Sequence, residues 1–200
     1  MQSSFLTEHS PPYCKEGARA MDVNKLARDH GRVVFLAAFR ILNDHARAED
    51  VQQSVFLRLL ERPIPNHRWA SIEEPAAYLS VMATRLAIDE LRRRRRWRFF
   101  TPDEEAGLAG EVEQPPAVRE QAVAAQRLRQ AIARLPRRQA QCFALRVFEG
   151  SELAEIADHL SISANTVSVT LNRAMQSLRK TLCADALSSA AAAERTSGKE

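Results

Sequence analysis

ELAEIADHLSISANTVSVTLNRAMQSLRKTL, residues 152–182, is the stretch that decides the fold of this chain. Apolar residues recur at helical spacing on both sides of a polar break, Ser161-Ile162-Ser163. They are Leu153, Ile156, Ala157 and Leu160 before the break, and Val167, Leu171, Ala174, Leu178 and Leu182 after it. Two helices joined by a short turn are typical of a helix-turn-helix DNA-binding motif. A plain helical hairpin fits the apolar spacing too, but the short turn favours the helix-turn-helix DNA-binding motif.

The second helix of this motif presents polar side chains. Ser163 is placed to cap it. Short polar side chains can bond to base edges and phosphate oxygens, and a helix N-terminus attracts phosphate. The candidate duplex-binding residues are Ser163, Asn165, Thr166, Ser168, Thr170, Asn172, Arg173 and Arg179.

The bulk composition excludes several classes of protein. The 200 residues are 45% hydrophobic with a formal net charge of +4, which allows one or two ordinary domains and a mild attraction to nucleic acid. The three cysteines are far apart, which argues against a structural zinc site or a disulfide framework and fits a reducing cytosol. No apolar run approaches the roughly 20 residues of a spanning helix, and the N-terminus does not resemble a signal peptide. We expect a cytoplasmic protein.

The remaining periodic segments predict an all-α protein. Helices are expected at residues 22–42 and 46–61, separated by Asn43-Asp44 as stop and cap, and from Pro75 to about residue 98. Residues 62–71 are expected to form a loop. Further helices are expected at residues 118–133 and 137–149, with a break at Leu135-Pro136 and a stop at Gly150.

Charge and composition divide the chain into two small helical domains. Residues 101–120 contain six acidic residues and one arginine, with three prolines, which predicts a flexible acidic linker. The expected segments are a disordered tail at 1–21, a domain at 22–100, the linker at 101–117, a domain at 118–184 and a disordered tail at 185–200. Met1 and Met21 both remain possible starts of translation.

Five consecutive arginines, Arg92 to Arg96, end the first domain and precede Trp97, Phe99 and Phe100. Such a run concentrates positive charge where a nucleic-acid backbone could lie, and the aromatic rings are stacking platforms for unpaired bases. A solvated or membrane-surface basic patch is the alternative.

Three stretches together resemble the extracytoplasmic-function group of bacterial sigma-70 factors. Residues 135–182 are similar to the C-terminal domain of that group. AEDVQQSVFLRLLE (48–61) and EEPAAYLSVMATRLAIDELRRRRR (73–96) resemble conserved stretches of its N-terminal domain. The sequence AYL…LAIDELRR is most similar to that of the iron-uptake-type branch.

The resemblance implies two DNA-binding roles. The helix from Ala164 to Lys180 would read the −35 element as duplex. The loop from Arg62 to Ser71 and the helix from Ala76 to Arg96 would open the −10 element and hold the melted strand, with candidate residues Asn66, Trp69, Arg85, Asp89, Arg92, Arg93 and Arg96. Asp89 is also placed to pair with Arg93 on the helix surface, and Trp69 fits the core as well as a pocket wall.

The resemblance also implies protein partners. The face carrying Glu49, Asp50, Gln53 and Phe56 would dock on core RNA polymerase, although a solvated helix face is the plain alternative. The linker would thread the polymerase towards the RNA exit channel, or act only as a tether. An anti-sigma factor, often membrane-bound, is a further expected partner. No cofactor, metal or small-molecule substrate is expected.

The sequence departs from the pattern of the group at several positions. Ser54 and Thr84-Arg85 replace the usual residues of the N-terminal domain. Ser161 replaces a frequent turn glycine, and Ser168 and Thr170 stand where Lys and Arg are common. The last two changes predict weak duplex binding by the C-terminal domain, with a reduced dependence on salt.

Two other functions are open to a chain with this motif. A stand-alone helix-turn-helix repressor or activator would be dimeric on a two-fold operator, and it leaves the stretch at 48–61 and the arginine run without a role. An enzyme is disfavoured, because the sequence has no Gly-rich phosphate loop, nucleophile-and-base set or metal-ligand cluster.

Overall fold

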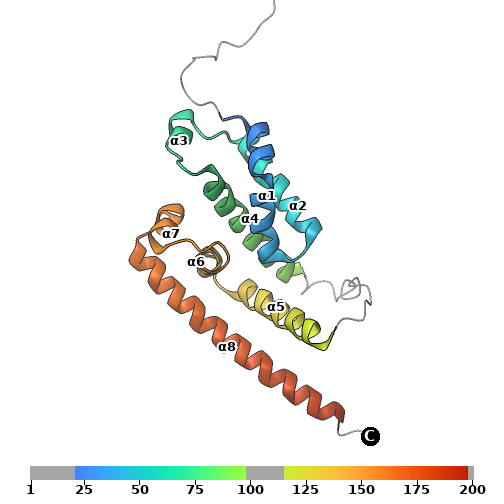
Figure 1. Ribbon diagram of the computed structural model, residues 1–200. Helices are drawn as coiled ribbons and strands as arrows, with labels where there is room; N and C mark the ends of the chain where they lie inside the picture. The colour runs from blue at the N-terminus through green and yellow to red at the C-terminus, as the bar shows by residue number, and fades with distance from the viewer. Residues whose placement is uncertain (1–20, 98–114, 198–200) are drawn as a thin grey trace, which may run out of the picture.

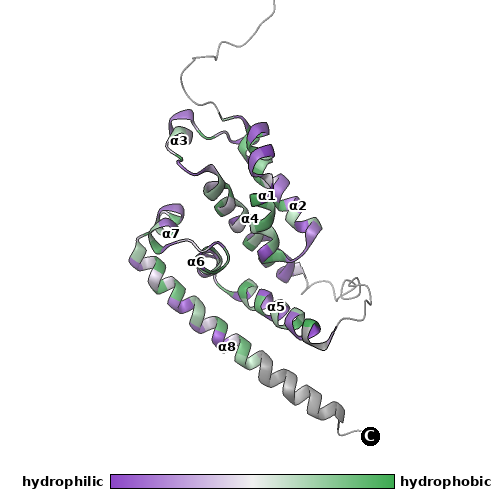
Figure 2. Cartoon of the chain, viewed as in Figure 1, coloured by the Kyte–Doolittle hydropathy of each residue, from purple (hydrophilic) through white to green (hydrophobic). Residues whose placement is uncertain are grey.

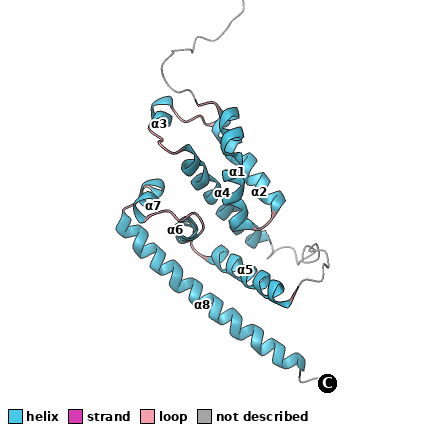
Figure 3. Cartoon of the chain, viewed as in Figure 1, coloured by secondary structure: helices cyan, strands magenta, loops and turns pink. Residues whose placement is uncertain are grey.

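The computed structural model describes residues 21–97 and 115–197, and every regular element in these ranges is an α-helix (Figures 1 and 3). The all-α prediction is therefore confirmed. Four helices precede the acidic linker and four follow it. The expected linker at 101–117 and the tail at 1–21 fall almost entirely outside the described residues.

Three long helices form the N-terminal module: α1 (Val23–Leu42), α2 (His45–Glu61) and α4 (Pro75–Trp97). Asp22 caps α1 by accepting a hydrogen bond from the Lys25 amide at 3.1 Å. Asn43 then ends α1 in a left-handed conformation, φ 49°, and Asp44 caps α2 by accepting from the Arg47 amide at 3.1 Å. The predicted Asn43-Asp44 boundary is confirmed.

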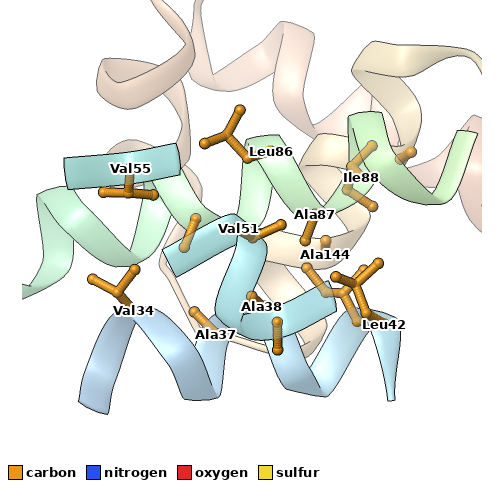
Figure 4. Close-up of a cluster of buried hydrophobic side chains, with 14 of the residues drawn as sticks. Val34, Ala37, Ala38, Leu42, Val51, Val55, Leu86, Ala87, Ile88 and Ala144 are labelled. Atoms are coloured by element: carbon orange, nitrogen blue, oxygen red, sulfur yellow. The ribbon is translucent and has the colours of Figure 1, made fainter. Parts of the chain in front are cut away.

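The core of this module lies where the three helices meet, and hydrophobic residues gather there (Figures 2 and 4). Each helix contributes residues at i, i+3 and i+4 spacing, as an amphipathic helix should. The fully or almost fully buried members include Val34, Ala37, Ala38, Ile41, Ala48, Val55, Leu79, Ala83, Ala87 and Ile88.

The segment between α2 and α4 differs from its prediction. Residues 62–71 are not all loop, because Asn66–Ala70 form a short helix, α3. The Trp69 ring is only 7% exposed and meets Tyr78 of α4 edge-on, with ring centroids 6.5 Å apart. Burial of a large aromatic ring stabilises this turn although its polar sequence has no helical period.

Helices α5 (Pro116–Arg134), α6 (Arg137–Val147), α7 (Leu153–Leu160) and α8 (Ala164–Ser197) form the C-terminal module. Leu135 and Pro136 separate α5 from α6 as predicted. Gly150 follows α6 with φ 72°, a backbone conformation that suits glycine. α5 begins two residues before its predicted start, and α6 ends two residues before its predicted end at 149.

The C-terminal end of the chain corrects a second prediction. The segment 185–200 was expected to be disordered, yet α8 continues to Ser197. The sequence of this segment, rich in alanine, explains the difference, because alanine has the highest helix propensity of all residues. α8 therefore extends well beyond the helix-turn-helix, alongside α5 (Figure 1).

The two modules are packed together. α4 of the N-terminal module contacts α5 and α6 of the C-terminal module. Ala144 of α6 lies among core residues of the N-terminal module, close to Ala87 and Ile88 of α4 (Figure 4). α4 is thus covered on one side by α1 and α2 and on another by α6.

Candidate nucleic-acid and polymerase interfaces

The turn of the helix-turn-helix is fixed by local hydrogen bonds. A reciprocal capping box between Glu152 and Glu155 begins α7, with the Glu152 amide donating to the Glu155 carboxylate at 2.8 Å. Ser161 ends α7 in a left-handed conformation, φ 53°, and the Ile162 amide donates to the Ala157 carbonyl at 3.0 Å. These bonds set the direction in which the next helix leaves the turn.

Ser163 caps the N-terminus of α8, as predicted. Its hydroxyl oxygen accepts a hydrogen bond from the Thr166 amide at 3.2 Å. On the inner side of α8, Val167, Ala174 and Leu178 are buried against α5, α6 and α7. The opposite side of the helix faces solvent.

The exposed side of α8 carries most of the candidate duplex-binding residues. Asn165, Thr166, Asn172, Arg173 and Arg179 are exposed, and Ser163 is exposed at the cap. Ser168 and Thr170 are half-buried, on the two flanks of this face. The structure therefore places the predicted set along the N-terminal half of one helix.

Two residues of this exposed face were not among the candidates. Val169 is 41% exposed and lies between Asn165 and Asn172 on the same side of the helix, and Gln176 is exposed one turn after Asn172. The sequence did not predict the exposure of Val169, because an apolar residue in an amphipathic helix is assigned to the core. Its position two residues after the buried Val167 was the available signal.

The candidates for strand binding on α4 contact the other module. Arg137 of α6 forms two hydrogen bonds with Asp89, Nε to Oδ1 at 2.8 Å and Nη2 to Oδ2 at 2.6 Å. Arg85 donates to the His159 carbonyl at the end of α7, and Arg92 donates to the Leu135 carbonyl. Three of the seven candidates are thus engaged by the C-terminal module.

The other candidates of this group are spread over α3 and α4. Arg93 pairs with Glu90 at 2.7 Å, whereas Asp89, for which pairing with Arg93 was the alternative, pairs with Arg137. Arg96 and Asn66 are exposed, whereas Trp69 is in the core. Of the two positions expected for Trp69, core and pocket wall, the structure has the core position.

Positive charge converges where α4 meets the C-terminal module. Burial lowers the pKa of Arg85, and the charges of Arg138 and Arg137 lower it further. Burial also lowers the pKa of His159, followed by the effect of the Arg85 charge. The contact between the modules therefore brings like charges close together in a partly desolvated place.

The candidate polymerase-binding face lies on the outer side of α2. Glu49, Asp50 and Gln53 are exposed, while Phe56 is half-buried and packs against the core. Sequence reasoning missed Leu57 and Leu60, which are 54% and 57% exposed. With Asp50 and Gln53 they form one stripe at helical spacing, and that spacing was the signal.

No set of three or more His, Cys, Asp and Glu side chains in the described ranges is arranged to hold a metal ion. Among the same residues, no helix is both long and apolar enough to cross a membrane.

Comparison with known families gives two matches, in the order of the modules. Residues 26–97 match the family described as "Sigma-70 region 2", and residues 125–178 match "Sigma-70, region 4". The first match covers almost all of the N-terminal module, and the second covers the C-terminal module from the middle of α5 to the middle of α8.

Curated relatives extend over both modules. The chain is 31% identical to the "ECF RNA polymerase sigma factor SigL" of Mycobacterium tuberculosis over 168 residues, which cover 82% of this chain and 91% of that protein. It is 27% identical to the "ECF RNA polymerase sigma factor SigE" of Mycolicibacterium smegmatis, covering 78% of this chain but only 60% of that protein.

A solved structure is also similar. The sigma factor RpoE of Bartonella quintana, in complex with the anti-sigma factor NepR, matches 81% of this chain and 97% of its own with a TM-score of 0.47 and 15% identity.

Proposed function

Because this chain belongs to the extracytoplasmic-function group of the bacterial sigma-70 family, we propose that it binds core RNA polymerase and directs initiation at promoters that it recognises through two DNA elements. The C-terminal module reads a −35 element as duplex. The N-terminal module holds the melted strand of a −10 element. The protein has no active site of its own and gives the polymerase its promoter preference.

The observation that carries this proposal is the exposed face of α8. Its first three turns present amide, hydroxyl and guanidinium groups from Asn165, Thr166, Asn172 and Arg173. Asn bonds well to adenine and Arg to guanine in the major groove. Val169, in the middle of this face, is suited to contact with a thymine methyl group.

The N-terminal module supplies the strand-binding groups. Arg85, Asp89 and Arg92 share one face of α4, and Arg93 and Arg96 lie on the same helix further along. Asn66 is exposed on α3, where a flipped base would enter. The buried Trp69 has a supporting role, since it anchors α3 against Tyr78.

The outer stripe of α2 is the proposed docking surface for polymerase. Leu57 and Leu60 expose apolar surface beside the polar side chains of Asp50 and Gln53. An apolar centre with a polar rim is the usual composition of a protein–protein interface. Glu49 belongs to the rim, and Phe56 supports the stripe from beneath.

The remaining roles follow from membership of the group. The acidic linker threads the polymerase towards the RNA exit channel, and an anti-sigma factor restrains the free protein in the cytoplasm. Membership of the iron-uptake-type branch is a proposal that rests on the sequence AYL…LAIDELRR alone.

Run-off transcription and gel shift, each with and without core polymerase, test the proposal. The purified chain should bind promoter DNA weakly alone and strongly with core polymerase, and transcripts should start at fixed positions. Start sites mapped after overexpression should share two upstream elements. Tight operator binding by a dimer without polymerase would overturn the proposal in favour of a stand-alone regulator.

A further inference from the structure

A cavity of about 600 Å³ lies between the C-terminal end of α4, the helix α5 and the turn that joins α1 to α2. Both modules contribute to its wall, and Arg95 of α4 donates to the Ala133 carbonyl of α5 at 3.5 Å. Figure 1 shows the end of α4 beside α5. The volume is typical of small-molecule sites, which measure roughly 300 to 1,000 Å³. No residue proposed for DNA or polymerase binding is among the described residues that line it.

Positive charge dominates the wall of this cavity. Its guanidinium groups belong to Arg94, Arg95, Arg129 and Arg134. The one carboxylate among the described lining residues, Asp44, accepts hydrogen bonds from the Arg47 amide at 3.1 Å and from Arg47 Nε at 3.0 Å. Because this carboxylate is already paired, the described wall carries an excess of positive charge that attracts anions.

Arg129 is a half-buried cation in this wall. Burial lowers the pKa of its guanidinium group. Among the described residues, this guanidinium group has neither an ion pair nor a hydrogen-bond partner. A partly desolvated charge without a partner is unfavourable, and an anion in the cavity would offset that cost.

The rest of the wall is apolar or carries amide groups. Apolar surface comes from Leu42, Leu91 and Ala133, and side-chain amides come from Asn43, Gln126 and Gln130. Apolar side chains can cover the faces of a flat ring, and amides can donate to and accept from the polar atoms at its edge. Guanidinium groups suit phosphate, because their paired N–H donors match two phosphate oxygens. The wall therefore combines the groups that recognise a base with those that recognise phosphate.

We propose that this cavity binds a nucleoside di- or triphosphate, with the phosphates held by Arg129 and the other lining arginines and the ring held against the apolar wall. The inference goes beyond the proposed function, since the site needs neither promoter DNA nor polymerase. Because both modules line the cavity, the bound ligand should stabilise the contact of α4 with α5.

Isothermal titration of the full chain with ATP and with GTP tests the proposal. At least one nucleotide should bind with a stoichiometry of one and should raise the temperature of thermal unfolding. It should bind more tightly than tripolyphosphate, which lacks the ring, and more tightly than the nucleoside, which lacks the phosphates. Absence of binding by both nucleotides would overturn the proposal, and so would equal binding of tripolyphosphate.

Two substitutions in the wall test the location of the site. Arg129→Gln should weaken nucleotide binding about tenfold, which is the usual effect of losing one hydrogen bond to a charged group. Gln130→Glu should weaken it by a similar factor, because it places a negative charge beside the phosphates.

Arg127→Gln and Gln121→Glu are the matched controls, since they make the same charge changes on α5 outside this cavity. They should keep the wild-type affinity for nucleotide. Equal losses in the controls would mean that overall charge holds the anion, and the proposal would fail. Displacement of bound nucleotide by a single-stranded oligonucleotide of mixed sequence would also overturn it, because the cavity would then belong to a path for nucleic acid.

Discussion

At the residue scale, Ser161 is a point of strain in the helix-turn-helix. It adopts φ 53° and ψ 52°, and its amide donates to carbonyls of α7. A residue with a Cβ atom pays roughly 1 to 2 kcal/mol in this left-handed region, whereas glycine does not. The serine hydroxyl gives no bond that offsets this cost in the hydrogen bonds described for the turn.

Ser161→Gly should therefore stabilise the protein against urea by about 1 kcal/mol, since it relieves the left-handed conformation without moving the turn. Ser161→Ala is the matched control and should be close to wild type, because alanine keeps the Cβ atom. Equal stabilisation by glycine and alanine would show that the backbone conformation is not the cause.

At the element scale, helix periodicity predicted α1, α2, α5 and the helix-turn-helix to within a few residues. It identified fewer of the buried residues on α4. There it found the stripe of Leu79, Met82 and Leu86 that faces α1 and α2. It missed Ser80, Val81, Thr84 and Ile88, which are also buried. A helix that is buried on two sides has no single apolar stripe. The contacts of α4 with the C-terminal module, which follows the linker in the sequence, leave no periodic pattern in the sequence of α4.

The candidate interfaces were predictable to different degrees. Polar residues on α8 could be assigned because polarity on an amphipathic helix indicates exposure. Val169, Leu57 and Leu60 were not assigned, because apolar residues are assigned to the core by default, although their spacing along the helices indicated exposure. The partners of Asp89 and Arg85 lie on other helices, and no local pattern in the sequence reports them.

The stripe on α2 gives a prediction about polymerase binding. Leu57→Ser/Leu60→Ser should weaken binding to core polymerase by roughly tenfold or more, since loss of two apolar contacts at an interface centre commonly exceeds about 1.4 kcal/mol. The unfolding free energy should hardly change, because both side chains are more than half exposed. Affinity can be measured by fluorescence anisotropy of labelled chain.

Val33→Ser/Leu36→Ser is the matched control for this experiment. These side chains are also exposed and apolar, at 39% and 36%, but lie on α1. An equal loss of polymerase binding in the control pair would contradict the assignment of the docking surface to α2.

The flanks of α8 give a prediction about duplex binding. Ser168 and Thr170 are half-buried on either side of the recognition face, where a longer cationic side chain could reach a phosphate. Ser168→Lys/Thr170→Arg should tighten binding to duplex and steepen the slope of log affinity against log salt by about 1.8, as two new phosphate contacts require.

Ser168→Gln/Thr170→Gln adds length without charge and is the control for the salt slope. Binding titrations at several salt concentrations measure both quantities. Tighter binding with an unchanged slope would mean that the new side chains do not contact phosphate.

At the scale of the whole molecule, the proposed function divides the two DNA elements between the modules, with duplex bound by one and melted strand by the other. α8 presents its proposed DNA-binding face to solvent, while Arg85, Asp89 and Arg92 of α4 contact the other module. A change on α4 should therefore affect a different step of initiation from a change on α8.

Arg92→Ala/Arg93→Ala tests this division in the presence of core polymerase. Strand opening, followed by permanganate reactivity of unpaired thymines, should fall about a hundredfold or more, since each of the two charged hydrogen bonds contributes about 1.5 to 3 kcal/mol. Retention of −35 duplex in gel shifts should change far less, because neither arginine belongs to the C-terminal module.

Arg28→Ala/Arg32→Ala removes the same charge from exposed positions of α1 and serves as the control. An equal loss of opening and duplex retention would mean that the arginines act through overall charge, and the assignment of melted strand to α4 would then fail.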